Sequence, residues 1–412
     1  MANCNRGVSP GGVSFAPLLF AGDINVYSVA RAFHEAFGIR SKVFGKYMQG
    51  PCLHSRIIDY TADPALEEPE VFVERVCSFA GQHEQDRVLL IGCGDSYVQL
   101  ASAHRGSFPE NVIVPSIDAA LMAELTHKEQ FYNLCARLGI EYPDTFVHRA
   151  GMGDAFSLPF EAPYIVKPSS GIEYWAHPFP GQKKMYKAST QEEVKSILAD
   201  VYASGYSDSM IVQNFVPGDD TNMRVLTSYS DRNGRVAMMC LGHVLLEEHT
   251  PKGAGNHAVI LTECDRELME RYRRLLDDLS YRGFSNFDIK YDSRDGRFKA
   301  FEINTRTGRS NYYVTASGAN VAQLLVDDCI DARPLPFYCA DADSLWMVVP
   351  RKVAFDYIKP EPYRRRMREL IREGRWVNPL HYAPDAGFRR SWSLLKNQLG
   401  HFVKYRKYVG KK

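Results

Sequence analysis

A set of oxygen-bearing side chains near residue 300 has the composition and spacing of a metal site. Apolar and polar residues alternate over Ser285–Tyr291 and Phe298–Ile303, and a polar turn between them predicts a β-hairpin. Residues two apart in a strand point to the same side, so Glu302 and Asn304 lie side by side, and Asp288 faces them from the partner strand. Carboxylate and amide oxygens suit Mg²⁺, which shares its remaining positions with phosphates and water. The hairpin therefore predicts a magnesium site; the alternative is a polar face exposed to solvent.

Two features of the same segment favour the metal site over a solvated face. Apolar side chains alternate with the three candidate ligands, so one face of the hairpin should be buried. The strand also runs into the loop Thr305–Arg309, which carries two fixed positive charges. A metal next to such a loop indicates an anionic ligand.

Two lysines precede the hairpin. Lys167 follows a strand-like stretch and precedes Ser169 and Ser170, small residues whose backbone N–H groups suit phosphate oxygens. Lys128 lies on a helix predicted over Ala119–Leu138. A lysine alone in either position is usually solvated, but their order ahead of the carboxylates favours a phosphate site.

A strand predicted over Met210–Phe215 ends at a Pro-Gly turn. Such an ending leaves backbone amides and carbonyls unpaired at Gln213, Asn214 and Phe215, where they suit the exocyclic amine and ring nitrogen of adenine. Asp220, past the turn, suits ribose hydroxyls. The alternative is an ordinary hairpin corner.

In this order, the motifs resemble the ATP-grasp superfamily over roughly Thr126 to Ile330. The phrases GDINVYSVARAFHEAFGI, KPSSGIEYW…GQKKMY and FEINTRTGRSNYYVTASG are similar to the subgroup that includes the D-aspartate ligases of peptidoglycan precursor synthesis. The resemblance implies an ATP-grasp fold of α/β and α+β parts. It also implies an ATP-dependent carboxylate–amine ligase that forms an amide through an acyl phosphate.

The resemblance assigns roles to the residues of the phosphate and metal sites. It implies that Lys128 and Lys167 contact the ATP phosphates and that Asp220 holds the ribose. The three oxygen ligands would bind two Mg²⁺ ions, with Mn²⁺ as an alternative, and Glu302 would bridge them.

Two arginines complete the implied site. Arg306 matches the basic residue that follows the Asn in relatives and would stabilise the acyl phosphate, and Arg224 is a candidate for the γ-phosphate. Gln213 stands where an acidic residue usually meets the adenine amine, and a glutamine carbonyl can also accept that hydrogen bond. Asn286 stands where D-alanine ligases place an arginine that acts on the transition state. In this chain Arg306, Arg309 or Arg224 would take that role.

The acceptor amine must attack in its neutral form, although an alkyl ammonium has a pKa near ~10. His243, His249 and His257 are candidates for a base, and each is also compatible with a structural role. The segment Ser169–Gly181, with its aromatic residues, is a candidate lid against water. Alternatively, those aromatics pack beneath a loop.

The N-terminal part alternates strands and helices. Strands are predicted over Phe15–Phe20, Lys42–Phe44 and Val88–Ile91, and this alternation is typical of a parallel sheet flanked by helices. The loops Gly22–Asn25 and Gly92–Ser96 follow strand ends, where such sheets bind ligands. The second half is predicted to be α+β with antiparallel strands.

We expect three domains. These are an N-terminal α/β domain over 1–125, an ATP-grasp domain over 126–335 with the nucleotide between two lobes, and a basic C-terminal extension over 336–412. From Arg351 onward the chain has 17 Lys/Arg against 5 Asp/Glu, so the remainder is acidic. We interpret the basic region either as a surface for anionic lipid at the inner membrane face or as a solvated or intersubunit surface.

Composition sets the protein class. An apolar content of 45% and a charged content of 24% are typical of a soluble globular protein. A net charge of +1 gives no general affinity for polyanions, so no nucleic acid is expected. Nine scattered cysteines without a CxxC pair favour a reducing cytoplasm. No apolar run reaches the ~18–20 residues of a membrane span.

The leading hypothesis is ligation of an amino acid, D-aspartate being one candidate, to an amine on a peptidoglycan stem peptide. The chain would act in the cytoplasm. If the basic region contacts lipid, the chain would be peripheral at the inner face of the membrane. A small-molecule amino-acid or dipeptide ligase is the alternative enzyme. A nucleotide-binding regulatory protein is the alternative from another class, and intact metal ligands argue against it.

Overall fold

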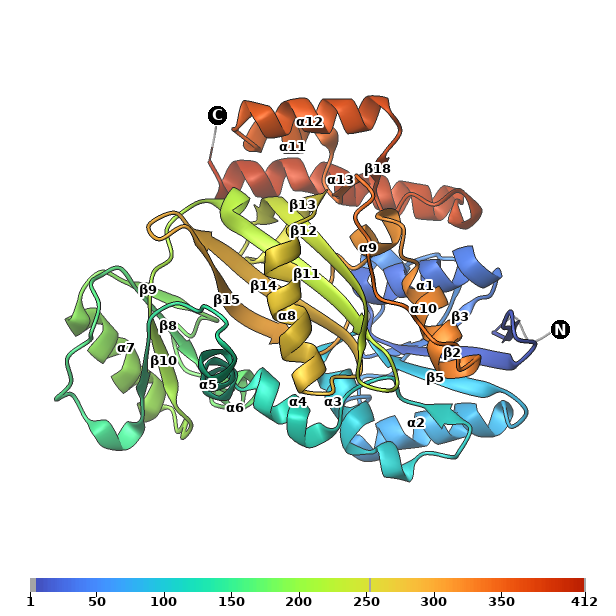
Figure 1. The fold of residues 1–412 in the computed structure, drawn as a ribbon, viewed down its shortest axis with the longest axis horizontal. Coiled ribbons are helices and arrows are strands. Elements are labelled where there is room, and N and C mark those ends of the chain that lie inside the picture. Colours follow the sequence, from blue (N-terminus) through green and yellow to red (C-terminus); the bar gives the residue numbers. More distant parts are fainter. Residues whose placement is uncertain (1–4, 252, 411–412) are drawn as a thin grey trace. The chain divides into compact units, whose positions relative to one another are not determined.

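The computed structural model describes residues 5–251 and 253–410, which form two compact units. The first unit comprises Met1–Ala119, Met223–Asn286 and Asn304–Lys412. The second comprises Ala120–Asn222 and Phe287–Ile303. Each unit contains at least one sheet (Figure 1) and has its own apolar core.

The N-terminal part of the first unit contains a parallel sheet in the order β4-β3-β2-β5-β6, with β1 antiparallel to β2. The predicted parallel sheet is therefore confirmed. Its central strand β2 is buried almost throughout, as expected for a strand covered on both faces. The strands are β1 Gly7–Val8, β2 Ser14–Phe20, β3 Ser41–Gly45, β4 Ile58–Ala62, β5 Arg87–Gly92 and β6 Val112–Ile113. The helices are α1 Ile24–Phe37, α2 Pro69–Gln82 and α3 Asp95–Ala103.

Helix α1 begins and ends at clear sequence signals. The Asp23 carboxylate accepts a hydrogen bond from Asn25 N at 3.0 Å and so caps the first turn. Gly38 ends the helix with φ of 69°, a left-handed conformation that glycine adopts without strain. The cap places Asn25 at the carboxyl end of the parallel sheet.

A second sheet in the first unit is built on β11, β12 and β13, which pair antiparallel. The full sheet has the order β15-β14-β11-β12-β13-β17-β18, and β16 pairs with β12. The strands are β11 Met223–Ser230, β12 Val236–Glu248, β13 Asn256–Glu263, β14 Gly283–Asp292, β15 Arg297–Asn304, β16 Tyr338–Cys339, β17 Leu345–Met347 and β18 Trp376–Val377. The helices associated with this part are α8 Arg266–Asp278, α9 Tyr312–Ala316 and α10 Val321–Leu325.

The basic C-terminal region is a folded part of the first unit. It forms α11 Arg351–Tyr357, α12 Glu361–Arg372 and α13 Phe388–Tyr408 (Figure 1). Val353, Met367 and Tyr405 share one apolar core with residues of β12, β13 and β17. Deleting this region would therefore expose core residues. Among the described residues, no helix is long and apolar enough to cross a membrane.

The inner side of α13 gives a pH-dependent prediction. Burial lowers the pKa of His401 to about 4, Lys404 acts in the same direction and Glu248 opposes both. Between pH 6.5 and 4 the unfolded chain binds a proton that folded His401 does not. The free energy of unfolding should therefore fall as the pH falls through this window, by at most ~1.4 kcal/mol per pH unit from this group. Urea unfolding at several pH values checks this, and a His401→Gln variant with the wild-type pH slope would contradict it.

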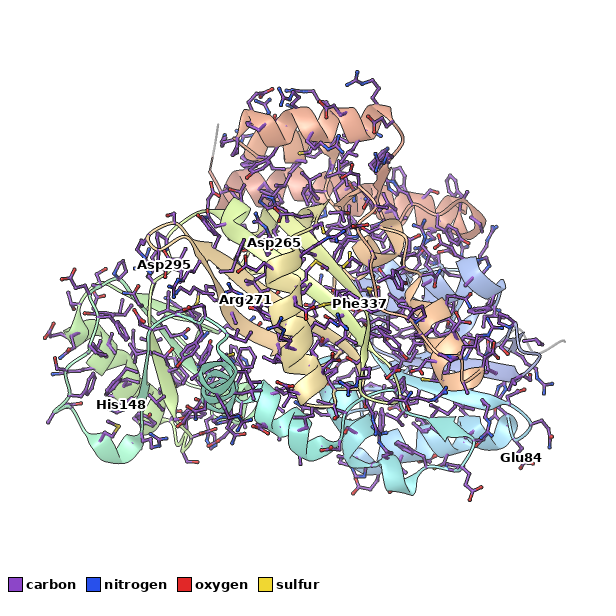
Figure 2. All side chains as sticks on the ribbon, viewed as in Figure 1. Glu84, His148, Asp265, Arg271, Asp295 and Phe337 are labelled. Carbon is purple, nitrogen blue, oxygen red and sulfur yellow. The ribbon has the colours of Figure 1, made fainter. Side chains whose placement is uncertain are left out.

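The second unit contains an antiparallel sheet in the order β7-β10-β8-β9. The outer parts of β14 and β15 also belong to this unit, and Asp295 lies in the turn that joins them (Figure 2). The strands are β7 Thr145–His148, β8 Tyr164–Pro168, β9 Tyr186–Ala188 and β10 Met210–Asn214. The helices are α4 Ala119–Thr126, α5 Lys128–Leu138, α6 Gly171–Ala176 and α7 Gln191–Ala203.

The prediction of a single helix over Ala119–Leu138 is wrong. The structure divides this segment into α4 and α5 at His127. The His127 backbone is extended, with φ of −82° and ψ of 114°, and its ring accepts from Gln130 N. Its Nε2 lies 2.9 Å from Asp208 Oδ2, a partner distant in sequence. The break makes Lys128 the first residue of α5.

Candidate active site

Lys167 lies on β8, directly opposite Ile211 of β10. Its Nζ donates to Tyr132 Oη at 2.8 Å and lies 5.7 Å from the centre of the Phe301 ring. Burial lowers the pKa of Lys167 to about 7, and repulsion from Lys128 acts in the same direction. A half-buried ammonium in this position is stabilised by an anionic ligand.

Glu302 on β15 carries a carboxyl group on which three lysines of the second unit act. Burial would raise the pKa of its carboxyl group, but attraction by Lys184, Lys128 and Lys167 lowers it to about 2. The carboxyl group of Asp288 on β14 is in hydrogen-bonding contact with it. The structure thus brings four predicted residues together, namely Lys128, Lys167, Asp288 and Glu302.

The donor set at this point fits a magnesium ion. Two carboxyl groups in contact repel each other unless a proton or a cation lies between them, and the lowered pKa keeps Glu302 ionised. Over residues 5–251 and 253–410, no group of three or more His, Cys, Asp or Glu side chains is arranged to hold a metal. A site formed by Asp288, Glu302 and the amide of Asn304 has only two such residues, so it agrees with that finding. Hard oxygen donors in this number suit Mg²⁺, which keeps several positions for phosphates and water.

Sequence reasoning missed Lys184. It lies between α6 and β9, is exposed, and makes the largest attractive contribution of the three lysines at Glu302. The phrase GQKKMY, which contains Lys184, is part of the family resemblance, but the Lys183-Lys184 pair in it was given no role because it also suits a solvated surface.

We predict that Lys184→Met raises the KM for ATP by about tenfold to a hundredfold, because one charge-assisted contact to phosphate is worth ~1.5–3 kcal/mol. Steady-state kinetics at varied ATP concentration measures the change. Lys183→Met is the matched control, since its exposed amine lies 5.9 Å from the Tyr186 ring and is not among the three lysines that lower the pKa of Glu302 most. Equal effects of the two substitutions would argue against a phosphate contact at Lys184.

The two serines after Lys167 have internal roles. Ser169 Oγ lies 2.8 Å from Ser209 Oγ, and its backbone N–H donates to Ser209 O. Ser170 caps α6 through Glu173 N, and its own N–H donates to Tyr206 Oη at 3.3 Å. Neighbouring segments of the unit accept both hydrogen bonds, and the predicted contact of these N–H groups with phosphate stays a prediction.

The expected lid contains a short helix, α6. Tyr174 is buried, and its hydroxyl donates to Lys183 O at 2.8 Å, so this aromatic packs beneath the segment. Trp175 beside it is 55% exposed. Tyr174 therefore agrees with the interpretation that the aromatics pack beneath a loop. Trp175, which is exposed, remains a candidate for a lid against water.

The segment expected to hold adenine is more fully paired than predicted. Asn214 N donates to Asp144 O at 2.9 Å and Phe215 N donates to Pro163 O at 3.0 Å. The side-chain amide of Gln213 donates to Thr145 Oγ1 at 2.8 Å. The prediction of unpaired N–H groups at Asn214 and Phe215 is wrong, because loop carbonyls continue the pairing of β10. Backbone carbonyls there still suit an adenine amine.

Lys290 of β14 fixes the connection after β10. Its buried Nζ donates to Val216 O at 3.0 Å and to Gly218 O at 3.3 Å. Gly218 has φ of 110°, and a Cβ at this position would lie 2.4 Å from Asn222 atoms, so the turn requires glycine. Asp220 begins the helical turn that follows. Sequence reasoning missed Lys290, although it lies two residues from Asp288.

In the first unit, Arg306 is held in a fixed orientation. Its Nε and one Nη donate to the two Asp95 oxygens at 2.7 and 3.0 Å, a bidentate pair. The same guanidinium lies 3.4 Å from Asn304 Oδ1. Asp95 begins α3 and lies within Gly92–Ser96, the segment that was expected to bind ligands.

Asn25 links the loops around Arg306. Its buried amide Nδ2 donates to Cys93 O at 2.6 Å and to Thr307 O at 2.7 Å. Its Oδ1 accepts from Thr307 Oγ1 at 3.0 Å and from Asn311 Nδ2 at 2.5 Å. Arg309 reaches Asp23, the cap of α1, at 3.1 Å. The two strand-end loops of the parallel sheet and the loop after β15 therefore form one hydrogen-bonded structure.

Arg224 on β11 is buried and paired with Glu263 of β13, with a further Nη2···Oε1 contact of 3.3 Å. His243, opposite Arg224 in the sheet, lies 4.0 Å from the same carboxylate. His257 lies 4.0 Å from Glu247 and 3.4 Å from Ser310 Oγ. These contacts give both histidines structural partners.

Comparison with known proteins identifies one strong sequence relative. No family model matches the chain. The D-aspartate ligase of Enterococcus faecium (strain Aus0004) is 37% identical over 407 residues, which cover 96% of each protein.

Solved structures show similarity of fold at low sequence identity. The L-amino acid ligase from Bacillus licheniformis has a TM-score of 0.52 and 13% identity, covering 76% of this chain and 74% of that chain. N5-carboxyaminoimidazole ribonucleotide synthetase from Thermus thermophilus has a TM-score of 0.55 and 16% identity, covering 80% and 82%. The biotin carboxylase domain of the Hydrogenobacter thermophilus 2-oxoglutarate carboxylase, in complex with MgADP, has a TM-score of 0.58 and 14% identity, covering 80% and 73%. These similarities confirm the predicted ATP-grasp fold.

Proposed function

Because the chain belongs to the D-aspartate ligase family, we propose that it uses ATP to join an amino-acid carboxylate to an amine. It is a ligase that forms carbon–nitrogen bonds. The γ-phosphoryl group passes from ATP to a carboxylate oxygen, which yields ADP and an acyl phosphate. The amine nitrogen then attacks the acyl carbon, orthophosphate leaves, and the amine loses a proton. The observation that carries this proposal is the cluster of lysines and carboxyl groups around Glu302.

Three lysines of the second unit, those that act on Glu302, bind the triphosphate. Lys128, Lys167 and Lys184 already surround one carboxylate, so their combined field favours a polyanion that brings its own cations. Lys167 is held by Tyr132 and so needs little rearrangement to contact a phosphoryl oxygen. Catalysis of phosphoryl transfer is largely such positioning and electrostatic stabilisation.

Asp288, Glu302 and Asn304 would hold magnesium. When bound, the ion neutralises charge on the phosphate oxygens. Glu302 is suited to this role because its pKa of about 2 keeps it ionised throughout the physiological range. Mn²⁺ has similar preferences for oxygen ligands.

The connection from Gln213 to Asp220 receives the nucleoside. Adenine would use backbone groups beyond Gln213, and Asp220 would accept hydrogen bonds from ribose hydroxyls. The Lys290 contacts to Val216 and Gly218 keep this connection in place. Ser169 and Ser170 support the phosphate side by fixing the backbone next to Lys167.

Arg306 and Arg224 would stabilise the acyl phosphate and the γ-phosphoryl group. A guanidinium can bind two oxygens of a phosphoryl group at once. The bidentate contact with Asp95 already presents Arg306 in one orientation. We therefore propose Arg306 as the main contributor and Arg224 as a second one.

For the substrates, we propose D-aspartate as the activated amino acid and an amine on a peptidoglycan stem peptide as the acceptor. The support is the relative that is 37% identical and named D-aspartate ligase. The cysteines at described positions are all free thiols, which supports a reducing, cytoplasmic setting.

An amine-dependent assay of phosphate release tests the proposal. The purified enzyme is incubated with MgATP, single D- or L-amino acids, and either a nucleotide-linked stem peptide or free amino acids as acceptor. We expect release only with D-aspartate and the stem peptide, and a product mass equal to both substrates minus water. Release with two free amino acids would establish a dipeptide ligase instead. No amine-dependent release with any pair would refute ligation.

A further inference from the structure

Helix α13 is attached to the first unit along one side. Arg390 Nε lies 2.8 Å from Asp385, and an Arg390 Nη donates to Pro51 O and Leu53 O. Leu394 and Tyr405 are buried in two apolar cores, and Gln398 donates to Val348 O at 2.8 Å. These residues of α13 are four or seven positions apart, so they define one face of the helix. The orientation of α13 on the unit is therefore fixed.

The opposite face of α13 is an exposed apolar stripe. It consists of Phe388, Trp392, Leu395, Leu399 and Val403, which are between 49% and 89% exposed. They also recur every third or fourth residue, so they are continuous along the helix. Large apolar side chains in an unbroken row are unusual on a surface that contacts only water.

The charges that α13 itself carries are all of one sign. Helix α13 contains six Lys/Arg and no Asp/Glu. Arg389, Lys396, Arg406 and Lys407 are exposed, and Lys396 Nζ lies 5.4 Å from the Trp392 ring centre. Apolar residues on one face with basic residues at its borders are the features of helices that lie in a membrane interface.

We propose that the outer face of α13 docks on the surface of an anionic lipid membrane. The apolar stripe would enter the boundary between headgroups and acyl chains, while the bordering lysines and arginines contact lipid phosphates. Charge complementarity favours this occupant over a second copy of the chain. In a two-fold contact the same faces meet, so basic residues would oppose basic residues with no acid on α13 to pair with them.

Sedimentation with sucrose-loaded vesicles tests the proposal on the full-length protein. We expect binding to vesicles of phosphatidylcholine mixed with phosphatidylglycerol. Binding to phosphatidylcholine alone should be weaker by about tenfold or more, since each Lys/Arg near an anionic surface adds affinity. Added salt should weaken binding to the anionic vesicles. Failure of the wild-type protein to sediment with the anionic vesicles would refute the proposal.

Two sets of variants assign the binding surface. Trp392→Ser combined with Leu395→Ser and Leu399→Ser should lower the partition coefficient by more than about tenfold. Circular dichroism and thermal unfolding check that this variant stays folded. Val8→Ser combined with Met152→Ser, which removes exposed apolar residues elsewhere, should bind as the wild type does.

Two outcomes would contradict the assignment. Unchanged vesicle binding by the stripe variant would show that another surface contacts lipid. Light scattering that gives a dimer for the wild type and a monomer for the stripe variant would show that a second copy covers the stripe. A monomeric wild type that binds anionic vesicles through the stripe would support the proposal.

Discussion

Replacing Glu302 by glutamine is expected to lower kcat by about a thousandfold or more, with the fold preserved. The amide cannot supply the negative charge that three lysines surround, and it is a poorer magnesium ligand. Loss of this group removes the electrostatic stabilisation on which phosphoryl transfer depends. Amine-dependent ADP release measures the activity, and far-UV circular dichroism monitors the fold.

The matched control for this substitution is Glu192→Gln, in the exposed first turn of α7. It makes the same chemical change in the same unit, away from the lysine cluster, and should retain wild-type turnover. Substantial residual activity in Glu302→Gln would contradict the assignment of the metal site. Loss of activity in both variants would instead indicate a general effect on the unit.

Lys167→Met is expected to lower kcat/KM for ATP by about a hundredfold to a thousandfold. The substitution removes a positioned positive charge of the kind that contributes ~3–4 kcal/mol when it stabilises a transition state. Methionine fills similar apolar space between Tyr132 and Phe301, so folding should be maintained. Steady-state kinetics and equilibrium binding of an ATP analogue measure the two effects.

Tyr132→Phe tests how much of the Lys167 effect comes from the position of its ammonium and how much from its charge. It retains the ring beside Lys167 and removes only the hydroxyl that accepts the 2.8 Å hydrogen bond. A smaller loss, of about tenfold or less, is expected because the ammonium remains. A Tyr132→Phe effect as large as that of Lys167→Met would show that the lysine is structural.

The sequence predicts those elements best whose signals are local. The alternation over Ser285–Tyr291 and Phe298–Ile303 predicted the hairpin, and the structure extends each strand by only a few residues. The break at His127 was not predictable, because the helix end depends on Asp208, about eighty residues away. Tertiary contacts of this kind leave no pattern in a short window.

The same difference between local patterns and tertiary contacts explains which site residues the sequence predicted. Lys167 and Glu302 were found because a known order of motifs marks them, and the structure places both in one charged cluster. Lys184, Tyr132 and Lys290 were given no role because neither a pair of lysines nor a single lysine or tyrosine has a distinctive spacing. The expected free backbone groups at Asn214 and Phe215 were wrong because loops distant in sequence pair with them.

The predicted limits of three domains remain a prediction. Compactness groups the C-terminal helices with the parallel sheet and the large antiparallel sheet in one unit. The basic composition of residues 351–412 is plain from the sequence, but no local pattern indicated that Val353 and Met367 would complete an apolar core.

One strand carries both Asp288, which we propose as a metal ligand, and the anchor Lys290. Side chains two apart lie on the same side of β14, so the contact to Glu302 and the contacts to Val216 and Gly218 move together. A one-residue slip of this strand would turn both away at once. If the proposed roles hold, base recognition and metal coordination would not be independently adjustable during evolution or engineering. Variants selected for another nucleobase should then also show altered metal preference.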